Sequence, residues 1–371
     1  MNIPPRPVRV VYVIDALATA GTETQLLALI RDLDRRRVQP ALVLLRGNSP
    51  QSLALEPINC PVVRLETGRL REPRTVLKGW KFLRFLWEFQ PDVVQTYFPD
   101  SSYFAVPLAL VAGVPYVVRT RNNIGHWMRT IDRWLGRILN PMVSATIANC
   151  QAAREALLRD EQPNPQRVHV LENGVDLDRF LEITPPCGPA RTVGVVANLR
   201  PVKGLDLLVE AARFLPGMTF RVAGEGDQRA VLQAMIDRHR LDFTLTGACH
   251  YIPAFLASLD IAVLCSRAEG LSNALLEYMA AARPIVATAV GATTELIRDG
   301  QEGFLVPPND ANALVQAIAR LRNHFAKARQ MGLAARRRAI ARFSRQAMIR
   351  RFENFYTRLV FGEMSHREIA A

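Results

Sequence analysis

Cysteines are few in this sequence and do not come in pairs. The five are an odd number and lie far apart without a CxxC motif: Cys60, Cys150, Cys187, Cys249 and Cys265. This spacing excludes a disulfide framework and argues against a zinc site. We therefore expect no bound metal and a reducing, cytoplasmic environment.

Long apolar runs are also missing. A membrane-spanning helix needs about 20 apolar residues, whereas the most apolar stretch, 104–118, is interrupted by Pro107, Gly113 and Pro115. Residues 1–7 are rich in proline and lack the apolar core of a signal peptide. The sequence therefore predicts a soluble protein, or a peripheral one on the inner face of the plasma membrane.

Lysine is scarce, but arginine is abundant. Only four of the 47 basic residues are lysine, and 34 acidic residues leave a net charge of +13. Because a guanidinium group binds phosphate through parallel hydrogen bonds, this composition favours partners that carry phosphate. The charge alone leaves open a nucleic acid, an anionic membrane and a nucleotide substrate. No nucleic-acid partner is expected, since the sequence shows neither a recognition helix nor an aromatic stacking platform.

Short β-branched runs alternate with longer helical stretches along the chain. The predicted strands are 8–14, 41–45, 62–65, 93–96, 114–118, 146–148, 168–171, 193–196, 220–222, 243–245, 261–264, 285–287 and 304–306. Continuous apolar strands separated by helices indicate parallel sheets that are covered on both faces. The fold class is therefore α/β.

Proline and glycine cluster at 181–191, between two such sets of strands, which is typical of a linker. The 371 residues also exceed the roughly 250–300 that a single core supports. We expect two doubly wound, Rossmann-like domains that face each other across a cleft, the first at 1–183 and the second at 184–343. Sheets of this kind bind ligands beyond the carboxyl ends of their strands.

The loop after the first strand contains Gly21 and Thr22. Thr22 and Gln25 have the spacing of a capping box, which predicts a helix that begins there with exposed N–H groups. A glycine lets a ligand approach the backbone, and a helix N-terminus attracts phosphate. The alternative is an ordinary glycine turn before a well-capped helix.

Two cations follow the first strand of the second domain. Arg200 and Lys203 are three residues apart in a strand-to-helix loop, where a guanidinium and an ammonium group can hold a diphosphate from two sides. The alternative is a solvated pair of surface charges.

The segment 265–280 carries two carboxylates. Ser272 or Asn273 is expected to cap a helix, so that Glu269 precedes this helix and Glu277 lies about one turn inside it. The first amides of the helix direct the positive end of its dipole at the same crevice. A carboxylate in an otherwise apolar helix needs a donor such as a sugar hydroxyl. The alternative is an ion pair between Glu277 and an arginine.

Glu269 and Glu277, with seven residues between them, resemble the E-x7-E motif of retaining GT-B glycosyltransferases, specifically glycosyltransferase family 4. The resemblance covers nearly the whole chain. Further segments that match in order and spacing are 21–23, 172–176, 200–204, 224–226, 246–247, 283–288, 291, 295 and 303–306. It implies the GT-B fold, with a C-terminal helix within 344–371 that crosses back to the first domain.

The resemblance also implies roles for the matching residues. Glu277 would hydrogen-bond the ribose hydroxyls of a nucleotide-sugar, and Glu269 would hold hydroxyls of its sugar. Arg200 and Lys203 would neutralise the diphosphate, and together with Glu269 and His126 they form the expected catalytic set. The expected donor-binding set is Gly21, Thr22, Arg200, Lys203, Gly224, His250, Tyr251, Ile252, Glu269, Gly270, Leu271, Ser272, Asn273 and Glu277. The reaction would retain the anomeric configuration and need neither a metal nor a cofactor.

The sequence departs from the family pattern in two places. Ala20 stands where many relatives have glycine. Many relatives also carry a histidine near the reacting sugar, after the fifth strand of the first domain. Here that region contains Arg121, Asn122 and His126, so either His126 or the pair Arg121 and Asn122 fills the position.

We therefore expect a retaining hexosyltransferase that moves a sugar from a nucleotide-diphospho-sugar to a glycan or lipid-linked acceptor, in the synthesis of a cell-surface polysaccharide such as lipopolysaccharide. The alternatives are a nucleotide-sugar epimerase on the same fold and a non-catalytic basic binding protein. In residues 69–90, Lys78, Lys81 and Arg84 lie among tryptophans and phenylalanines. This pattern suits an anionic membrane surface, and the alternative is a core helix with a basic outer face.

Overall fold

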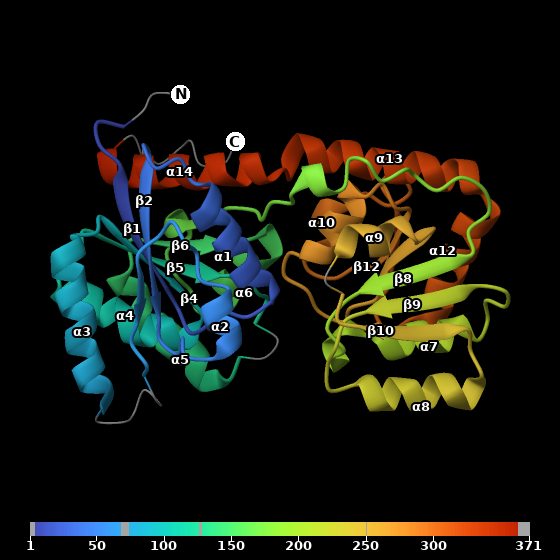
Figure 1. The fold of residues 1–371 in the computed structure, drawn as a ribbon, viewed down its shortest axis with the longest axis horizontal. Coiled ribbons are helices and arrows are strands. Elements are labelled where there is room, and N and C mark those ends of the chain that lie inside the picture. Colours follow the sequence, from blue (N-terminus) through green and yellow to red (C-terminus); the bar gives the residue numbers. More distant parts are fainter. Residues whose placement is uncertain (1–3, 68–73, 126–127, 250, 363–371) are drawn as a thin grey trace. The chain divides into compact units, whose positions relative to one another are not determined.

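Thirteen strands form two parallel sheets in the computed structural model, which describes residues 4–67, 74–125, 128–249 and 251–362. The chain divides into two units (Figure 1). The first comprises Met1–Glu172 and Gln346–Ala371, and the second comprises Asn173–Arg345. Each predicted strand is present, with bounds that differ by a few residues at most.

The first unit contains a seven-stranded sheet in the order β3-β2-β1-β4-β5-β6-β7. Its strands are β1 (Val8–Ile14), β2 (Val38–Leu44), β3 (Val62–Arg64), β4 (Val93–Tyr97), β5 (Tyr116–Arg121), β6 (Ala145–Ala148) and β7 (Val168–Val170). Its helices are α1 (Gly21–Asp32), α2 (Pro50–Ala54), α3 (Arg74–Phe89), α4 (Pro99–Val111), α5 (Thr130–Leu139) and α6 (Gln151–Asp160), with short 3-10 helices η1 (Asn140–Met142) and η2 (Pro165–Arg167). Because the strand order reverses at β1 and β4, the carboxyl edge there is where a ligand is expected.

Both faces of this sheet are buried, as the apolar strands predict. Along β1, Val10, Tyr12 and Ile14 pack on one face, in the cluster that includes α1. Val11 and Val13 pack on the other face, in the cluster that includes α3 and α4. Successive side chains of a strand point to opposite faces, so an apolar residue is needed at every position.

The C-terminal helix α14 (Arg345–Phe361) packs against the first unit's sheet, although it follows the second unit in the chain. Its apolar residues Met348, Phe352 and Phe355 join the same core as α1. The Tyr356 hydroxyl donates a hydrogen bond of 2.6 Å to Oε1 of Gln95, in the central strand β4. The predicted return of this helix to the first domain is therefore confirmed.

The second unit contains a six-stranded parallel sheet in the order β10-β9-β8-β11-β12-β13. Its strands are β8 (Thr192–Val196), β9 (Thr219–Ala223), β10 (Phe243–Gly247), β11 (Ile261–Leu264), β12 (Ile285–Thr288) and β13 (Phe304–Val306). Its helices are α7 (Leu205–Ala212), α8 (Arg229–His239), α9 (Ile252–Ala257), α10 (Asn273–Ala280), α11 (Thr293–Leu296), α12 (Ala311–Asn323) and α13 (Phe325–Arg342), with 3-10 helices η3 (Leu177–Arg179) and η4 (Pro201–Lys203). The strand order reverses at β8 and β11, which again marks the carboxyl edge between them as the expected ligand site.

Residues 173–183 belong to the second unit, whereas the sequence prediction placed them in the first domain. Val175 forms a β-bridge with Ser344. Arg336 on α13 donates hydrogen bonds to the carbonyl groups of Phe180 and Ile183. These contacts hold the segment against α13, and composition alone does not reveal them.

Within the described ranges, no helix is both long enough and apolar enough to cross a membrane.

Candidate active site

Two loops at the carboxyl edge of the second unit's sheet meet through an ion pair. Lys203 ends η4, which follows β8, and Glu269 lies in the loop that follows β11. The Lys203 ammonium nitrogen is 2.6 Å from Oε1 of Glu269. The Ser266 hydroxyl donates to the same oxygen at 2.7 Å. The fold thus brings together two residues that are 66 positions apart in the chain, both of them predicted site residues.

Arg267 links the same two loops through hydrogen bonds. Its backbone N–H donates to the carbonyl of Val202 at 2.7 Å, and its guanidinium donates to the carbonyl of Pro201 at 2.7 Å. Two further hydrogen bonds, of 2.8 and 2.6 Å, run to the carboxylate of Asp206 at the start of α7. Neither Arg267 nor Asp206 is among the site residues predicted from the sequence. Their separation of 61 residues leaves no local signal that would pair them.

Glycine is required where these loops touch. Gly291 has φ of +51°, and a Cβ atom there would lie 1.7 Å from the carbonyl oxygen of Glu269. At Gly204, with φ of +61°, a Cβ atom would lie 2.1 Å from the carbonyl oxygen of Cys265. Any other residue at either position would push the Glu269 loop out of place.

Glu277 lies one turn inside α10, on the same edge of the sheet. Of the two predicted N-caps the observed one is Ser272, whose side chain accepts a hydrogen bond from the Leu275 amide. Asn273 instead accepts a hydrogen bond of 2.9 Å from the Asn173 side chain. The first turn of α10 is thereby fixed from two sides.

The Glu277 carboxyl group makes no hydrogen bond or ion pair with any residue that the structure describes. Burial raises its pKa from 4.5 to about 7, and the nearby positive charge of Arg179 only partly offsets this rise. An acceptor that is held in a partly buried place without a donor is suited to a ligand hydroxyl. The predicted alternative, an ion pair with an arginine, is not formed among the described residues.

The remaining predicted residues of the second unit lie around this edge. Arg200 is exposed, and its guanidinium contacts no described residue by hydrogen bond or ion pair. Gly224, at φ of +149°, packs so closely that a Cβ atom would lie 1.9 Å from the Ala197 carbonyl oxygen. Tyr251, 61% exposed, is the N-cap of α9, and Ile252 is the first residue of that helix. His250 lies outside the described residues.

Gly270 and Leu271 complete the predicted set of the second unit. The Gly270 carbonyl accepts a hydrogen bond of 3.2 Å from the Ala292 amide. Leu271 is buried. Both residues therefore hold the loop between Glu269 and α10 in one conformation.

In the first unit, α1 begins at Gly21, two residues before the start that an N-cap at Thr22 predicts. The N-cap is Ala20, whose methyl side chain cannot accept a hydrogen bond, so the capping box predicted for Thr22 is wrong. The Thr22 hydroxyl instead accepts a long hydrogen bond of 3.4 Å from the side chain of Asn122. Gly21 and Thr22 thus occupy the first turn of α1, beyond the carboxyl end of β1.

A pocket opens at the carboxyl ends of β4 and β5. Its lining includes Thr22, Ser102, Arg121, Asn122 and Asp132. Arg121 and Asn122, one of the two alternatives predicted for the position near the reacting sugar, both line this pocket. His126, the other alternative, lies outside the described residues.

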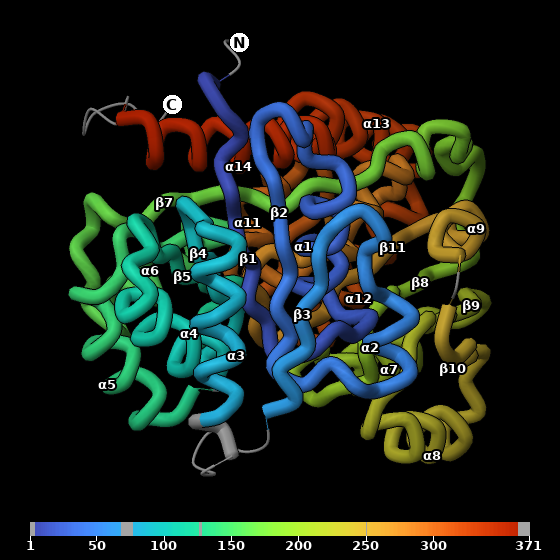
Figure 2. The backbone as a smooth tube through the Cα atoms, turned by 60° about the vertical axis from the view of Figure 1, so that its left-hand side comes forward, coloured from blue at the N-terminus to red at the C-terminus, as the bar shows by residue number. Residues whose placement is uncertain are grey.

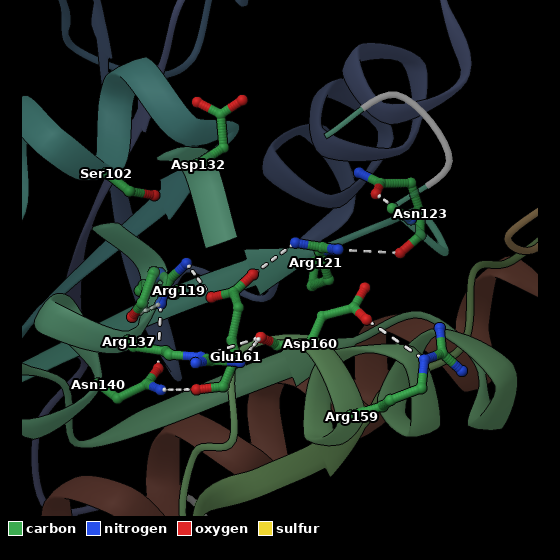
Figure 3. Close-up of polar contacts among 12 residues, drawn as sticks. Ser102, Arg119, Arg121, Asn123, Asp132, Arg137, Asn140, Arg159, Asp160 and Glu161 are labelled. Carbon is green, nitrogen blue, oxygen red and sulfur yellow. Dashed lines mark hydrogen bonds and ion pairs between the residues drawn. The ribbon is translucent and has the colours of Figure 1, made fainter. Parts of the chain in front are cut away.

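Two arginines that line this pocket, Arg119 and Arg121, share one buried glutamate (Figure 3). Glu161 is fully buried and accepts hydrogen bonds from Arg119 at 2.8 Å and from Arg121 at 2.6 Å. The Asn140 side chain donates to the Glu161 carbonyl at 2.8 Å. Burial lowers the pKa of Arg121, and its Nη2 atom is buried without a hydrogen-bond partner. Sequence reasoning missed Glu161, because an acidic residue after a helix gives no sign of burial.

In the described ranges, no three His, Cys, Asp or Glu side chains lie close enough together to hold a metal ion.

Two family models match the chain. The model described as "Glycosyl transferases group 1" matches residues 190–324, which hold the Lys203–Glu269 pair and Glu277. The model described as "Glycosyl transferase 4-like domain" matches residues 20–174, which hold the pocket of the first unit. Together the two matches cover most of both units.

Individual relatives agree with these models. The putative colanic acid biosynthesis glycosyltransferase WcaL of Salmonella typhimurium is 33% identical over 171 residues, and the aligned part is 42% of this chain and 42% of WcaL. The match therefore spans less than half of that relative. A UDP-Gal:alpha-D-GlcNAc-diphosphoundecaprenol alpha-1,3-galactosyltransferase of Escherichia coli is 22% identical over 296 residues, which is 70% of this chain and 73% of the relative.

The fold also matches a solved structure, that of Anabaena Alr3699/HepE in complex with UDP. The TM-score is 0.83 at 19% identity, over 94% of this chain and 99% of that one. The two parallel sheets and their helices are therefore those of the GT-B fold, as the sequence resemblance predicted.

Proposed function

Because the chain belongs to the group 1 glycosyl transferases, with a 4-like first domain, we propose that it transfers a sugar from a nucleotide-diphospho-sugar to a glycan or lipid-linked acceptor. We further propose that the anomeric configuration is retained and that no metal or cofactor takes part. The pathway proposed is the synthesis of a cell-surface polysaccharide, which is supported by the similarity to a colanic acid glycosyltransferase.

The observation that carries the proposal is the position of Glu277. Its carboxyl group is partly buried, lacks a described partner and lies on the same sheet edge as Lys203 and Glu269. A ribose presents two adjacent hydroxyl donors, which would satisfy both oxygens of this carboxylate. In the bound state we place the ribose at Glu277, the sugar hydroxyls at Glu269 and the base near Tyr251 and Ile252.

The diphosphate would meet the cations of the β8–α7 loop. The Arg200 side chain is exposed and its guanidinium group has no described partner, so it can turn to a phosphate without breaking an existing ion pair. Lys203 is already held at 2.6 Å from Glu269 and offers its remaining ammonium hydrogens. Such fixed cations stabilise the negative charge that develops on the diphosphate as the bond to the sugar breaks.

No further base is needed to remove the proton of the acceptor hydroxyl. As the C–O bond between the sugar and the diphosphate breaks, the bonding electrons go to the phosphate oxygen. The acceptor hydroxyl attacks the resulting cationic sugar from the same face and loses its proton to that oxygen. We propose that this is how the configuration is retained.

The acceptor would enter the pocket of the first unit. Its polar lining, with Ser102, Asn122 and Asp132, can bind hydroxyl groups. Arg121 or Asn122 would contact the reacting sugar. One relative acts on a diphosphoundecaprenol-linked sugar, which supports a lipid-linked acceptor here.

A lipid-linked acceptor would place the enzyme at an anionic membrane, and we propose helix α3, within the segment 69–90, as one contact. Trp80 and Trp87 on this helix are 61% and 45% exposed, and Lys81 and Arg84 beside them are exposed as well. Residues 69–73 of this segment lie outside the described residues.

Transfer from a panel of UDP-, GDP-, ADP- and TDP-sugars to lipid-linked and free glycan acceptors tests the proposal. We expect product with at least one donor and no detectable product from Glu277→Ala. Glu210→Ala is the matched control and should transfer as the wild type does. Glu210 is a partly exposed glutamate of the same unit that pairs with Arg213.

Two other outcomes would contradict the proposal. Conversion of the nucleotide-sugar without an acceptor would indicate an epimerase. Binding of oligonucleotides that weakens steeply with salt, without any binding of nucleotide-sugars, would indicate a basic binding protein.

A further inference from the structure

Helix α5 has an exposed apolar stripe that the proposed chemistry does not use. Ile131, Trp134 and Ile138 are 45%, 56% and 44% exposed. Their spacing of three and then four residues places them along one side of the helix. Met142, in η1 directly after the helix, is 37% exposed and continues this row. Clustered exposure of this kind marks an interaction surface rather than a scatter of single residues.

Positive charge lies beside the stripe. Arg133 and Arg137 are exposed on the same helix. The Arg129 side chain just before it is 78% exposed and is paired with Asp132 at 3.1 Å, so its charge is offset. The single acidic residue of α5 is Asp132, which is buried on the opposite side. The outer side of α5 therefore combines a tryptophan and two isoleucines with cations and carries no acid.

Helix α5 shares its layer with α3. The helices α3, α4 and α5 pack side by side over one face of the first unit's sheet (Figure 2), with α4 in contact with both neighbours. Leu77, Trp80 and Trp87 on α3 and Val111 at the end of α4 are exposed as well. The apolar side chains of α5 thus belong to a helical layer with a second tryptophan-bearing, basic helix.

We propose that α5 lies in the interface of an anionic bilayer, with Trp134 and Ile138 among the acyl chains and Arg133 on lipid phosphates. Amphipathic helices with tryptophan on one side and cations on the other bind in this way. Arginine and lysine side chains that lie close to a membrane surface are attracted to its anionic headgroups. A second copy of the chain is a poorer occupant, because it would set one arginine-bearing surface against another in a protein of net charge +13.

The other side of α5 reaches the pocket of the first unit. Asp132 lines that pocket and accepts a hydrogen bond from the Tyr103 hydroxyl. A bilayer against the outer side of α5 would therefore hold a lipid-linked sugar one helix away from Arg121 and Asn122. This consequence rests on the proposed function, whereas the binding of α5 to lipid does not.

Flotation of the full chain with vesicles tests the inference. The probes are vesicles of phosphatidylcholine alone and of phosphatidylcholine mixed with phosphatidylglycerol. We expect binding to the anionic vesicles only, and a loss of at least about tenfold in partition for the double variant Trp134→Ser, Ile138→Ser. Arg133→Gln should lose about fivefold on the anionic vesicles, as expected for one interfacial cation.

The matched control is Phe214→Ser with Val231→Ser. These side chains are 57% and 53% exposed on the second unit, and their replacement should leave partition unchanged. Circular dichroism melting identifies any variant that fails to fold. The inference is overturned if wild-type protein does not float with anionic vesicles, or if the folded α5 variant floats as wild type does. It is also overturned if the α5 variant instead dissociates a dimer seen by light scattering.

Transfer to a water-soluble glycan separates this inference from the proposed function. The α5 variant should keep wild-type transfer to that acceptor and lose transfer to a lipid-linked acceptor in vesicles. If the protein transfers sugar but does not bind vesicles, only the role proposed for α5 is overturned. Vesicle binding by a protein that transfers no sugar would overturn only the proposed function.

Discussion

Replacing Glu277 with glutamine should remove the part of the pH dependence of stability and of nucleotide affinity that the Glu277 carboxyl group contributes. The native pKa of Glu277 is about 7, against an ordinary value of 4.5, because burial disfavours the carboxylate. Since the native state holds this proton more tightly than the unfolded state, the free energy of unfolding falls as pH rises from about 4.5 to 7. The group then remains a destabilising charge at higher pH.

The size of the effect follows from the shift. A pKa rise of about 2.5 units corresponds to about 3 kcal/mol, an upper value because Glu277 is not fully enclosed. Glutamine keeps the shape of the side chain without the ionisable proton. Relative to the wild type, Glu277→Gln should therefore gain up to about 3 kcal/mol in unfolding free energy between about pH 4 and pH 8.

Nucleotide binding should change with pH in the opposite direction. If ribose hydroxyls donate to the Glu277 carboxylate, binding requires the ionised form. Below its pKa the wild-type affinity for a nucleoside diphosphate should therefore weaken, by about fivefold from pH 7 to pH 6. Glu277→Gln should bind weakly at every pH and show none of this dependence.

Urea unfolding and isothermal titration calorimetry across this pH range measure the two effects. Glu210→Gln is the control, since Glu210 is a partly exposed glutamate of the same unit. Stability of Glu277→Gln that runs parallel to that of the wild type would refute the raised pKa. Affinity of the wild type that is flat with pH would refute the contact between Glu277 and the nucleotide.

Three further substitutions test the supports of the two sites. Glu161→Gln leaves two buried guanidinium groups without their anion, so the free energy of unfolding measured in urea should fall by about 3–5 kcal/mol. A fall of less than about 1 kcal/mol would contradict the buried ion cluster. Gly291→Ala should lower the free energy of unfolding by at least about 2 kcal/mol. The control Gly300→Ala should lower it by about 1 kcal/mol, because Gly300 also has positive φ but has open space around its Cβ position. Arg267→Met removes the partly exposed ion pair with Asp206, which contributes little to the free energy of unfolding. The melting temperature should therefore change little, whereas the KM for the donor should rise several-fold. An unchanged KM would show that Arg267 does not hold the Lys203 loop.

The strands, and the position of the candidate site residues Lys203 and Glu269 in loops after strands, could be predicted from the sequence because both depend on local signals. Buried parallel strands read as short apolar runs, and each loop at a carboxyl edge directly follows one of them. Lys203 and Glu269 each follow such a strand, at β8 and β11, and these strands are neighbours in the sheet. Their meeting therefore follows from the topology.

The supports of the site could not be predicted, because they depend on distant partners. Arg267 pairs with Asp206, and Glu161 pairs with Arg119 and Arg121 across about 40 residues. Helix α1 begins two residues before the start that the capping-box pattern at Thr22 predicts, with Ala20 as an N-cap that has an extended backbone and no capping side chain. The exposed stripe on α5 could not be predicted either, because apolar residues at the same spacing also occur on helices that bury them. Only the exposure seen in the structure distinguishes these two cases.

A crystal structure of the protein with UDP tests the central claim most directly. The account predicts the ribose hydroxyls within hydrogen-bonding distance of the Glu277 carboxylate, and the diphosphate beside Lys203 and Arg200. A nucleotide bound elsewhere, with Glu277 still lacking a ligand contact, would contradict it.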